Sequence, residues 1–128
     1  MKKYTVRKTT TQDIENLIRI EHSAAQAFLK SNYAWIAKSP MMLEEIHLSL
    51  IANDYAYVVV NEFDQAVAFI YAKKYNNDFY ILEFDVDLEL QKQGIGRQLL
   101  EFVINIAQIE NFDSVTLTTF VDVAWNKP

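Results

Sequence analysis

The stretch that decides the fold is residues 79–97, FYILEFDVDLELQKQGIGR. Its first part, residues 79–86, is rich in aromatic and branched side chains, which is typical of a buried strand. Its last part contains both glycines of the chain, Gly94 and Gly96, and a helix is expected from about Gly94. The buried side of that helix is predicted to carry Leu99, Leu100, Val103, Ile104 and Ala107.

The surrounding sequence extends this unit into a mixed α/β domain. Residues 114–120 form a further strand, so strand, helix and strand make a parallel crossover unit. Upstream we predict a first strand at residues 4–7, followed by one helix that begins near Thr11 and a second that begins at Ser39-Pro40. A hairpin of two strands is predicted at residues 55–60 and 66–71. A polar turn is predicted at residues 73–78. We expect one domain covering residues 1–128, because this length lies within the usual size of a single domain.

The loop between strand and helix has the features of a pyrophosphate site. Glycine lets a backbone approach a ligand closely, and a helix start offers unpaired N–H donors with the positive end of the helix dipole. A P-loop is excluded, because Gly96 is followed by Arg97 instead of lysine and serine or threonine. A dinucleotide-binding fingerprint is excluded too, because Leu99 stands where a third small residue is needed.

The remaining pattern is Val86-x-Leu88-x-x-Gln91-x-x-Gly94-x-Gly96, followed by a helix. It resembles the acetyl-CoA motif of the GNAT family of N-acetyltransferases. The resemblance covers nearly the whole chain, because a helix, an aromatic connection and a Ser-Pro helix precede the motif, and a strand with an asparagine-containing turn at residues 124–128 follows it. It implies a GNAT-like fold with a mixed α/β sheet and acetyl-CoA as the acetyl donor.

The resemblance also implies which residues contact acetyl-CoA. Backbone N–H groups of Gln93, Gly94, Ile95, Gly96 and Arg97 would hold the pyrophosphate, and the Gln91 side chain would brace the loop. A solvated Arg97 is the alternative for that side chain. The fourth and fifth strands would splay apart, so that pantetheine lies against the backbone of Asp85 and Val86, with Asn126 as a further contact. An exposed N–H there could stabilise the oxyanion.

Acidic residues interrupt two apolar patterns. Glu21 falls on the apolar stripe of the helix that begins near Thr11. In an alternating strand, one face carries Leu82, Phe84 and Val86 and the other carries Ile81, Glu83 and Asp85. A buried Glu83 would have a raised pKa and could accept the proton of an amine as the catalytic base. A carboxylate on a solvated face is the alternative, and the sequence leaves both open.

The remaining candidate residues are interpreted from their position in the family pattern or from the lack of a neighbouring metal ligand. Phe28, Tyr33, Trp35 and Met42 fall where the family builds its acceptor pocket, although aromatic residues there are also common in a core. No metal site is expected, because His22 and His47 have no partner ligand at metal spacing. We interpret each histidine as a surface or satisfied helix residue.

The amino-acid composition indicates which kinds of partner the chain can bind. The net charge of -5 disfavours nucleic acid and favours a cationic substrate. With no cysteine, the chain has neither a disulfide nor a cysteine nucleophile. Neither a signal peptide nor a membrane span is evident, so a cytoplasmic location without membrane contact is expected.

The sequence departs from the family at its C-terminal end. Relatives continue beyond the position of Pro128 into a helix, often with a catalytic tyrosine, and further strands. We therefore expect a C-terminally truncated GNAT fold, with an exposed edge on its fifth strand that favours a homodimer. The predicted function is acetyl transfer from acetyl-CoA to a primary amine of a small cation or a protein. The alternative is a catalytically impaired acetyl-CoA-binding or interaction module.

Overall fold

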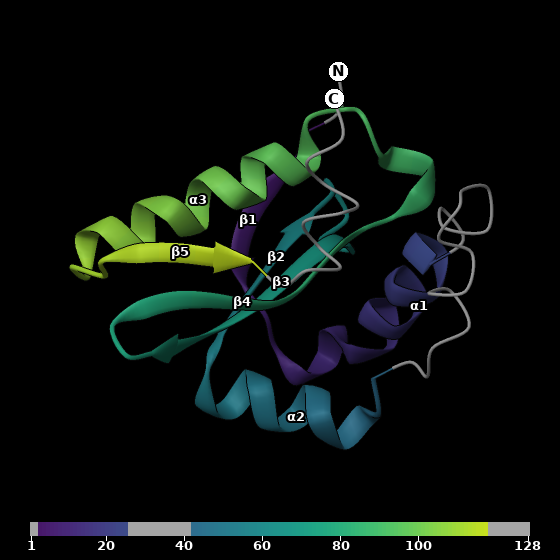
Figure 1. Ribbon diagram of the computed structural model, residues 1–128. Helices are drawn as coiled ribbons and strands as arrows, with labels where there is room; N and C mark the ends of the chain where they lie inside the picture. Colours follow the sequence, from purple (N-terminus) through teal and green to yellow (C-terminus); the bar gives the residue numbers. More distant parts are fainter. Residues whose placement is uncertain (1–2, 26–41, 118–128) are drawn as a thin grey trace.

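A five-stranded mixed sheet organises the part of the chain that the computed structural model describes, residues 3–25 and 42–117 (Figure 1). The strand order is β1-β2-β3-β4-β5. The strands are β1 (Thr5–Lys8), β2 (Tyr55–Val60), β3 (Ala66–Tyr75), β4 (Asp78–Val86) and β5 (Ser114–Leu117). The helices are the 3₁₀ turn η1 (Thr11–Asp13), α1 (Ile14–Ala25), α2 (Glu44–Asn53), the 3₁₀ turn η4 (Leu88–Leu90) and α3 (Ile95–Ile109).

The topology agrees with the sequence prediction. Strands β1 to β4 pair antiparallel, whereas β4 and β5 pair parallel and are connected through α3. Helix α3 covers one face of the sheet, and α1 with α2 cover the other (Figure 1). The predicted mixed α/β sheet and the crossover unit are therefore confirmed.

The two faces of the sheet have separate cores. Leu99 and Val103 of α3 are fully buried against one face, and Leu17 and Ile20 of α1 are fully buried against the other. Burial of these apolar side chains, about 1.5–3 kcal/mol for each, holds the helices to the sheet. Glu21 lies in the buried stripe of α1 together with Ile20. A carboxylate is thus enclosed between α1 and the sheet.

A β-bulge changes the faces of β4. Tyr71 pairs with Glu83 and Ala72 pairs with Ile81, so Leu82 is an extra residue without a partner on β3. The α3 side of β4 consists of Phe79, Ile81, Phe84 and Val86, whereas Leu82 packs on the opposite side. The sequence predicted that Leu82 shares a face with Phe84, and that Ile81 shares a face with Glu83. Both predictions are therefore wrong. The bulge reverses the alternation at Leu82.

Element boundaries show two further differences. Leu43 is extended and α2 begins at Glu44, whereas the predicted helix start at Ser39-Pro40 lies outside the described ranges. The predicted turn at residues 73–78 is shorter than expected, because β3 and β4 are joined by Asn76 and Asn77 alone. Both asparagines have positive φ, 57° and 86°, as a two-residue hairpin turn requires. Asparagine tolerates that conformation, so the strands continue up to it.

Candidate functional site

The loop between β4 and α3 has the backbone geometry of an anion site. Gly94 is the N-cap of α3, with φ 83° and ψ 2°, and Lys92 also has a positive φ of 70°. No backbone N–H from Lys92 to Arg97 donates a hydrogen bond to any described residue; the first such bond runs from the Gln98 N–H to the Gly94 carbonyl. Six consecutive donors at the positive end of α3 therefore have no acceptor among the described residues.

Hydrogen bonds hold the residues that precede this loop. The Gln91 side chain donates to the Val86 carbonyl at 3.2 Å, which closes the chain between the end of β4 and the loop. The Asp87 N–H donates to the Val67 carbonyl at 2.9 Å, which fixes the same turn to β3. The Gln91 side chain thus links the loop to the end of β4.

Helix α1 supports the turn from the other side. The Ser23 hydroxyl donates to the Asp87 carboxylate at 3.1 Å and accepts from the Leu88 N–H at 2.9 Å. Arg19 adds an ion pair to Asp87 at 2.9 Å. Burial alone would raise the pKa of Asp87, but its hydrogen bonds with Arg19, Glu89 N–H and Ser23 outweigh this effect and lower the pKa. Asp87 is therefore a charged anchor between α1 and the loop.

The other predicted loop residues differ in exposure. The side chains of Gln93 and Arg97 are exposed, whereas Ile95 and Gly96 are buried in the first turn of α3. Arg97 forms only a long ion pair with Glu101, at 3.9 Å, and its side chain is 83% exposed. Among described residues Arg97 is thus a solvated arginine, which was the alternative reading of this side chain.

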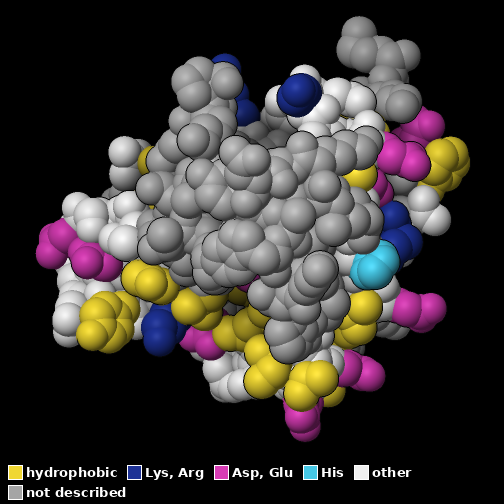
Figure 2. All heavy atoms as spheres, turned by 45° about the vertical axis from the view of Figure 1, so that its right-hand side comes forward, with side chains coloured by type: hydrophobic (Ala, Val, Ile, Leu, Met, Phe, Trp, Pro, Cys, Tyr) yellow, Lys and Arg dark blue, Asp and Glu magenta, His cyan; other side chains and the backbone are white. Residues whose placement is uncertain are grey.

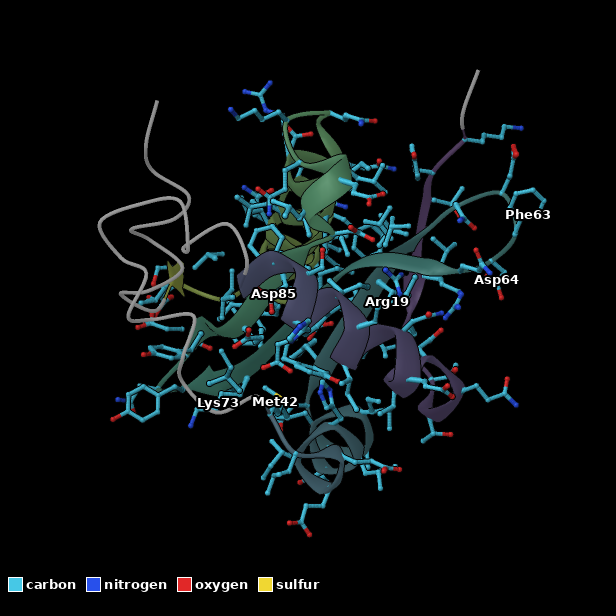
Figure 3. The ribbon with its side chains drawn as sticks, turned by 90° about the vertical axis from the view of Figure 1, so that its right-hand side faces the viewer. Arg19, Met42, Phe63, Asp64, Lys73 and Asp85 are labelled. Atoms are coloured by element: carbon cyan, nitrogen blue, oxygen red, sulfur yellow. The ribbon has the colours of Figure 1, made fainter. Side chains whose placement is uncertain are left out.

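Two carboxyl groups, Glu83 and Asp85, lie together on β4. They share a face of the strand and are hydrogen-bonded to each other. Both residues are partly buried, and the Asp85 Oδ2 atom is enclosed without a hydrogen-bond partner among described residues. Asp85 lies on the α1 side of the sheet, beneath that helix (Figure 3).

The environment of this pair favours a shared proton. Burial raises the pKa of Asp85 well above the usual range, and the hydrogen bond and charge of Glu83 raise it further. Burial also raises the pKa of Glu83, the hydrogen bond with Asp85 partly offsets this, and the charge of Glu21 adds to it. The protonated form is therefore favoured at both groups, and more strongly at Asp85.

The edge of β4 next to this pair faces β5. The described pairs between these strands end at Ile81 with Leu117, the last described residue of β5. Glu83, Asp85 and Val86 thus have no strand neighbour on that side within the described ranges. The Val86 side chain is buried in the α3 core, so only its backbone is available to a ligand.

Sequence reasoning missed a polar array next to these carboxyl groups. His47 of α2 is fully buried, and its Nδ1 lies 2.6 Å from the Tyr71 hydroxyl of β3. Its Nε2 lies 3.7 Å from Oε1 of Glu21. The prediction of a surface or fully satisfied histidine is wrong for His47, while His22 is exposed. The available signal was Glu21, which stands on an otherwise apolar stripe.

Several predicted site residues lie outside the described ranges, namely Phe28, Tyr33, Trp35 and Asn126. Of the predicted acceptor pocket, Met42 is described: it is half-buried beside the α1 and α2 core, and its N–H donates to Oε2 of Glu21 at 3.0 Å. Figure 3 shows Met42 at the start of the segment that leads into α2.

Three further kinds of feature were considered: a surface cavity, a metal site and a membrane-spanning helix. A cavity of about 290 Å³ lies beside the tip of the β2–β3 hairpin, lined in part by Tyr4, Phe63 and Leu90, and contains none of the predicted site residues. Within residues 3–25 and 42–117, no group of three metal-ligating side chains is close enough to hold an ion. In the same residues, no helix has the length and apolar character that a membrane crossing requires.

Comparisons with known proteins agree on the family. The model described as "Acetyltransferase (GNAT) family" matches residues 15–127. A mutant protein from Bacillus halodurans has a similar fold, with a TM-score of 0.75 and 22% identity over 94% of this chain and 86% of that chain. The PaiA N-acetyltransferase from Thermoplasma acidophilum, solved in complex with coenzyme A, gives a TM-score of 0.69 and 19% identity over 86% of this chain and 75% of that chain.

A third similar structure is the ribosomal-protein-S18-alanine N-acetyltransferase from Escherichia coli, with a TM-score of 0.73 and 18% identity over 95% of this chain and 73% of that chain. At these identities the structures show a shared fold. The family model covers most of the sequence, including the β4–α3 loop. The chain therefore belongs to the acetyltransferase (GNAT) family.

Proposed function

We propose that this protein is an N-acetyltransferase that transfers the acetyl group of acetyl-CoA to a primary amine. The observation that carries the proposal is the run of six backbone N–H groups, Lys92 to Arg97, that have no acceptor among described residues. These donors sit at the start of α3, directly after the strand that carries Glu83 and Asp85. A phosphate-binding loop and a proton acceptor are thus adjacent in one unit.

The residues present fit acetyl-CoA. Unpaired N–H groups at a helix N-terminus bind phosphate oxygens, and no described residue lies within 4 Å of the position that a Cβ on Gly94 would occupy. Gln91 and Asp87 keep the loop in this geometry. The backbone of Asp85 and Val86 would lie along the pantetheine, and Asn126 stays a predicted contact.

Glu83 is the proposed catalytic base. Acetyl-CoA, when bound, supplies a thioester carbonyl. An acceptor amine is mostly protonated at neutral pH and must lose a proton before its nitrogen can attack. Glu83 takes this proton, and its raised pKa makes it a stronger base than an exposed glutamate. Holding both reactants in one site supplies much of the remaining rate.

The surface supports a cationic acceptor. The chain carries a net charge of -5. At the start of α2, the exposed apolar residues Leu43, Ile46 and Leu48 lie beside the exposed acids Glu44 and Glu45, and Figure 2 shows hydrophobic and acidic side chains mixed along the lower edge of this face. Such a surface attracts cations and repels phosphate backbones. A small polycation and a protein amino group both meet this description.

The test begins with calorimetric titration of acetyl-CoA into the parent, Arg97→Gln and Arg97→Glu. Arg97 is exposed, so both variants should fold like the parent. We expect the parent to bind and Arg97→Glu to bind at least about tenfold more weakly, because a carboxylate at the helix start repels phosphate. A folded parent that does not bind acetyl-CoA would refute the proposal.

Turnover is tested separately on a panel of amines, with release of the coenzyme A thiol as the signal. We expect acetyl transfer to at least one amine and a loss of about a hundredfold or more in Glu83→Gln. If acetyl-CoA binds but no amine on the panel is acetylated, the protein is instead a coenzyme-binding module of the same fold.

A further inference from the structure

A buried polar array crosses from the helices to the candidate base. It is formed by Glu21 of α1, His47 of α2 and Tyr71 of β3, which we call the Glu21–His47–Tyr71 array. His47 and Tyr71 are fully buried, and Glu21 is 9% exposed. The two contacts of His47 measure 2.6 Å to the Tyr71 hydroxyl and 3.7 Å to Glu21 Oε1.

The array costs stability as it stands. The His47 Nε2 and Glu21 Oε1 atoms are enclosed, and neither has a hydrogen-bond partner within the described part of the chain. The rings of Phe69 and Tyr71 pack against the imidazole, so the surroundings have little water to replace the missing bonds. An enclosed polar group without its partner destabilises the folded state, and apolar side chains of similar volume would avoid that cost. The array therefore calls for a functional explanation.

Tyr71 connects the array to strand β4. Burial raises the pKa of Tyr71, and the charges of Glu21, Asp13 and Glu83 raise it further, so the phenol keeps its proton. The Tyr71 hydroxyl shares a hydrogen bond with Nδ1 of His47, whose Nε2 faces the Glu21 carboxylate. Tyr71 therefore contacts the array on one side and pairs with β4 on the other.

That other side is next to Glu83. Tyr71 and Glu83 are direct partners across the β3–β4 ladder, immediately before the bulge at Leu82, so their side chains lie on the same face of the sheet. The charge of Glu21 raises the pKa of Glu83, whereas a charge on His47 lowers it. Geometry and electrostatics both connect the array to the candidate base.

We propose that Glu21, His47 and Tyr71 are positioning residues for Glu83, arranged so that the Glu83 carboxylate takes the proton of the acceptor amine. The inference rests on the proposed function of Glu83. Tyr71 brings the array next to Glu83 across the β3–β4 ladder, and the negative charge of Glu21 favours the protonated form of Glu83. The ionisable groups that face this region are Glu21 from α1, His47 from α2, Tyr71 from β3, Asp85 from β4 and Asp13 from η1.

The test measures the pH dependence of kcat/KM for the parent, Glu21→Gln, Glu21→Asp and Glu15→Gln. The acid limb reports protonation of the base in the free enzyme. Removal of the Glu21 charge should move this limb to lower pH, whereas Glu21→Asp keeps the charge and should restore the parent position. Glu15 lies on the exposed side of the same helix and is the matched control, with no shift expected. The inference is overturned if the Glu21→Gln profile coincides with that of the parent or of Glu15→Gln.

A second measurement separates this inference from the proposed function. The carboxyl carbons of glutamate are labelled with ¹³C, and Glu83 is titrated by NMR in the parent and in Glu21→Gln, without substrates. The Glu83 titration should move to lower pH in Glu21→Gln and stay in place in Glu15→Gln. If the titration moves but no amine is acetylated, the array is coupled to Glu83 and the enzymatic function is wrong. If amines are acetylated but the titration does not move, the array is not coupled to Glu83 and the inference is wrong.

Discussion

Ser23 and Asp87 are joined by a hydrogen bond of 3.1 Å, although 64 positions separate them in the sequence. The same Ser23 oxygen accepts the Leu88 N–H at 2.9 Å, so one hydroxyl completes the turn η4 and ties it to α1. Helix α1 packs on the sheet face that carries Glu83 and Asp85, whereas the turn leads into the β4–α3 loop, the proposed phosphate site. The Ser23–Asp87 contact therefore connects the two halves of the candidate site.

Ser23→Ala should weaken this connection. The substitution leaves the Leu88 N–H without its acceptor and removes one of the two hydrogen bonds to Asp87 Oδ1, which keeps the bond from the Glu89 N–H, at a cost of about 1–2 kcal/mol of unfolding free energy. The loop should then hold acetyl-CoA severalfold less tightly. Urea unfolding and calorimetric titration measure the two effects. Ser49→Ala on the exposed side of α2 is the control and should change both by little; equal unfolding midpoints for the two variants would argue against a role for Ser23.

Gly94→Ala should destabilise the protein through its backbone alone. Gly94 has φ 83°, and no atom of residues 3–25 or 42–117 lies within 4 Å of an added Cβ, so the substitution strains the backbone without a collision with these residues. The expected loss is about 1–2 kcal/mol, together with weaker binding of acetyl-CoA. Gly94→Asn should lose less, because asparagine tolerates the left-handed conformation. Urea unfolding ranks the three proteins, and equal stability of all three would show that the left-handed N-cap is not maintained.

Asp85→Asn should stabilise the protein at neutral pH. Because the pKa of Asp85 is raised in the folded state, its contribution is favourable below the unfolded pKa and is lost as pH rises toward the folded pKa. Asparagine resembles the protonated acid and keeps a donor for Glu83. The gain at pH 7 should be about 1 kcal/mol or more, and should vanish near pH 3. A difference in unfolding free energy that does not depend on pH would contradict the raised pKa.

The sequence predicted the parts of the fold that depend on local patterns. The helix at Gly94 and the parallel crossover follow from glycine placement and from the spacing of apolar residues such as Leu99 and Val103, and both are confirmed. The bulge at Leu82 could not be predicted from β4 alone, because it depends on the register with β3. The side on which Ile81 lies is therefore a tertiary property of the sheet.

The candidate site was only partly predictable for the same reason. The loop from Gln91 to Arg97 is a local motif, and its free N–H groups follow from the helix start. The Glu21–His47–Tyr71 array joins three elements that are distant in sequence, so only the isolated acid on the α1 stripe signalled it. Acceptor identity, cytoplasmic location and a homodimer stay predictions, as do the roles of residues outside the described ranges.

Tyr71→Phe isolates the hydroxyl of the array. The phenyl ring keeps the packing against Phe69, but His47 Nδ1 loses its partner in an enclosed site. We expect a loss of about 1–3 kcal/mol in unfolding free energy, measured with urea at pH 7. Tyr80→Phe is the matched control, because Tyr80 is half-buried on β4 and contacts Tyr75 through its ring, and it should change stability by less than about 0.5 kcal/mol. If Tyr71→Phe is as stable as Tyr80→Phe, the hydrogen bond to His47 contributes nothing to the fold, and the array would need water or a ligand to explain its burial.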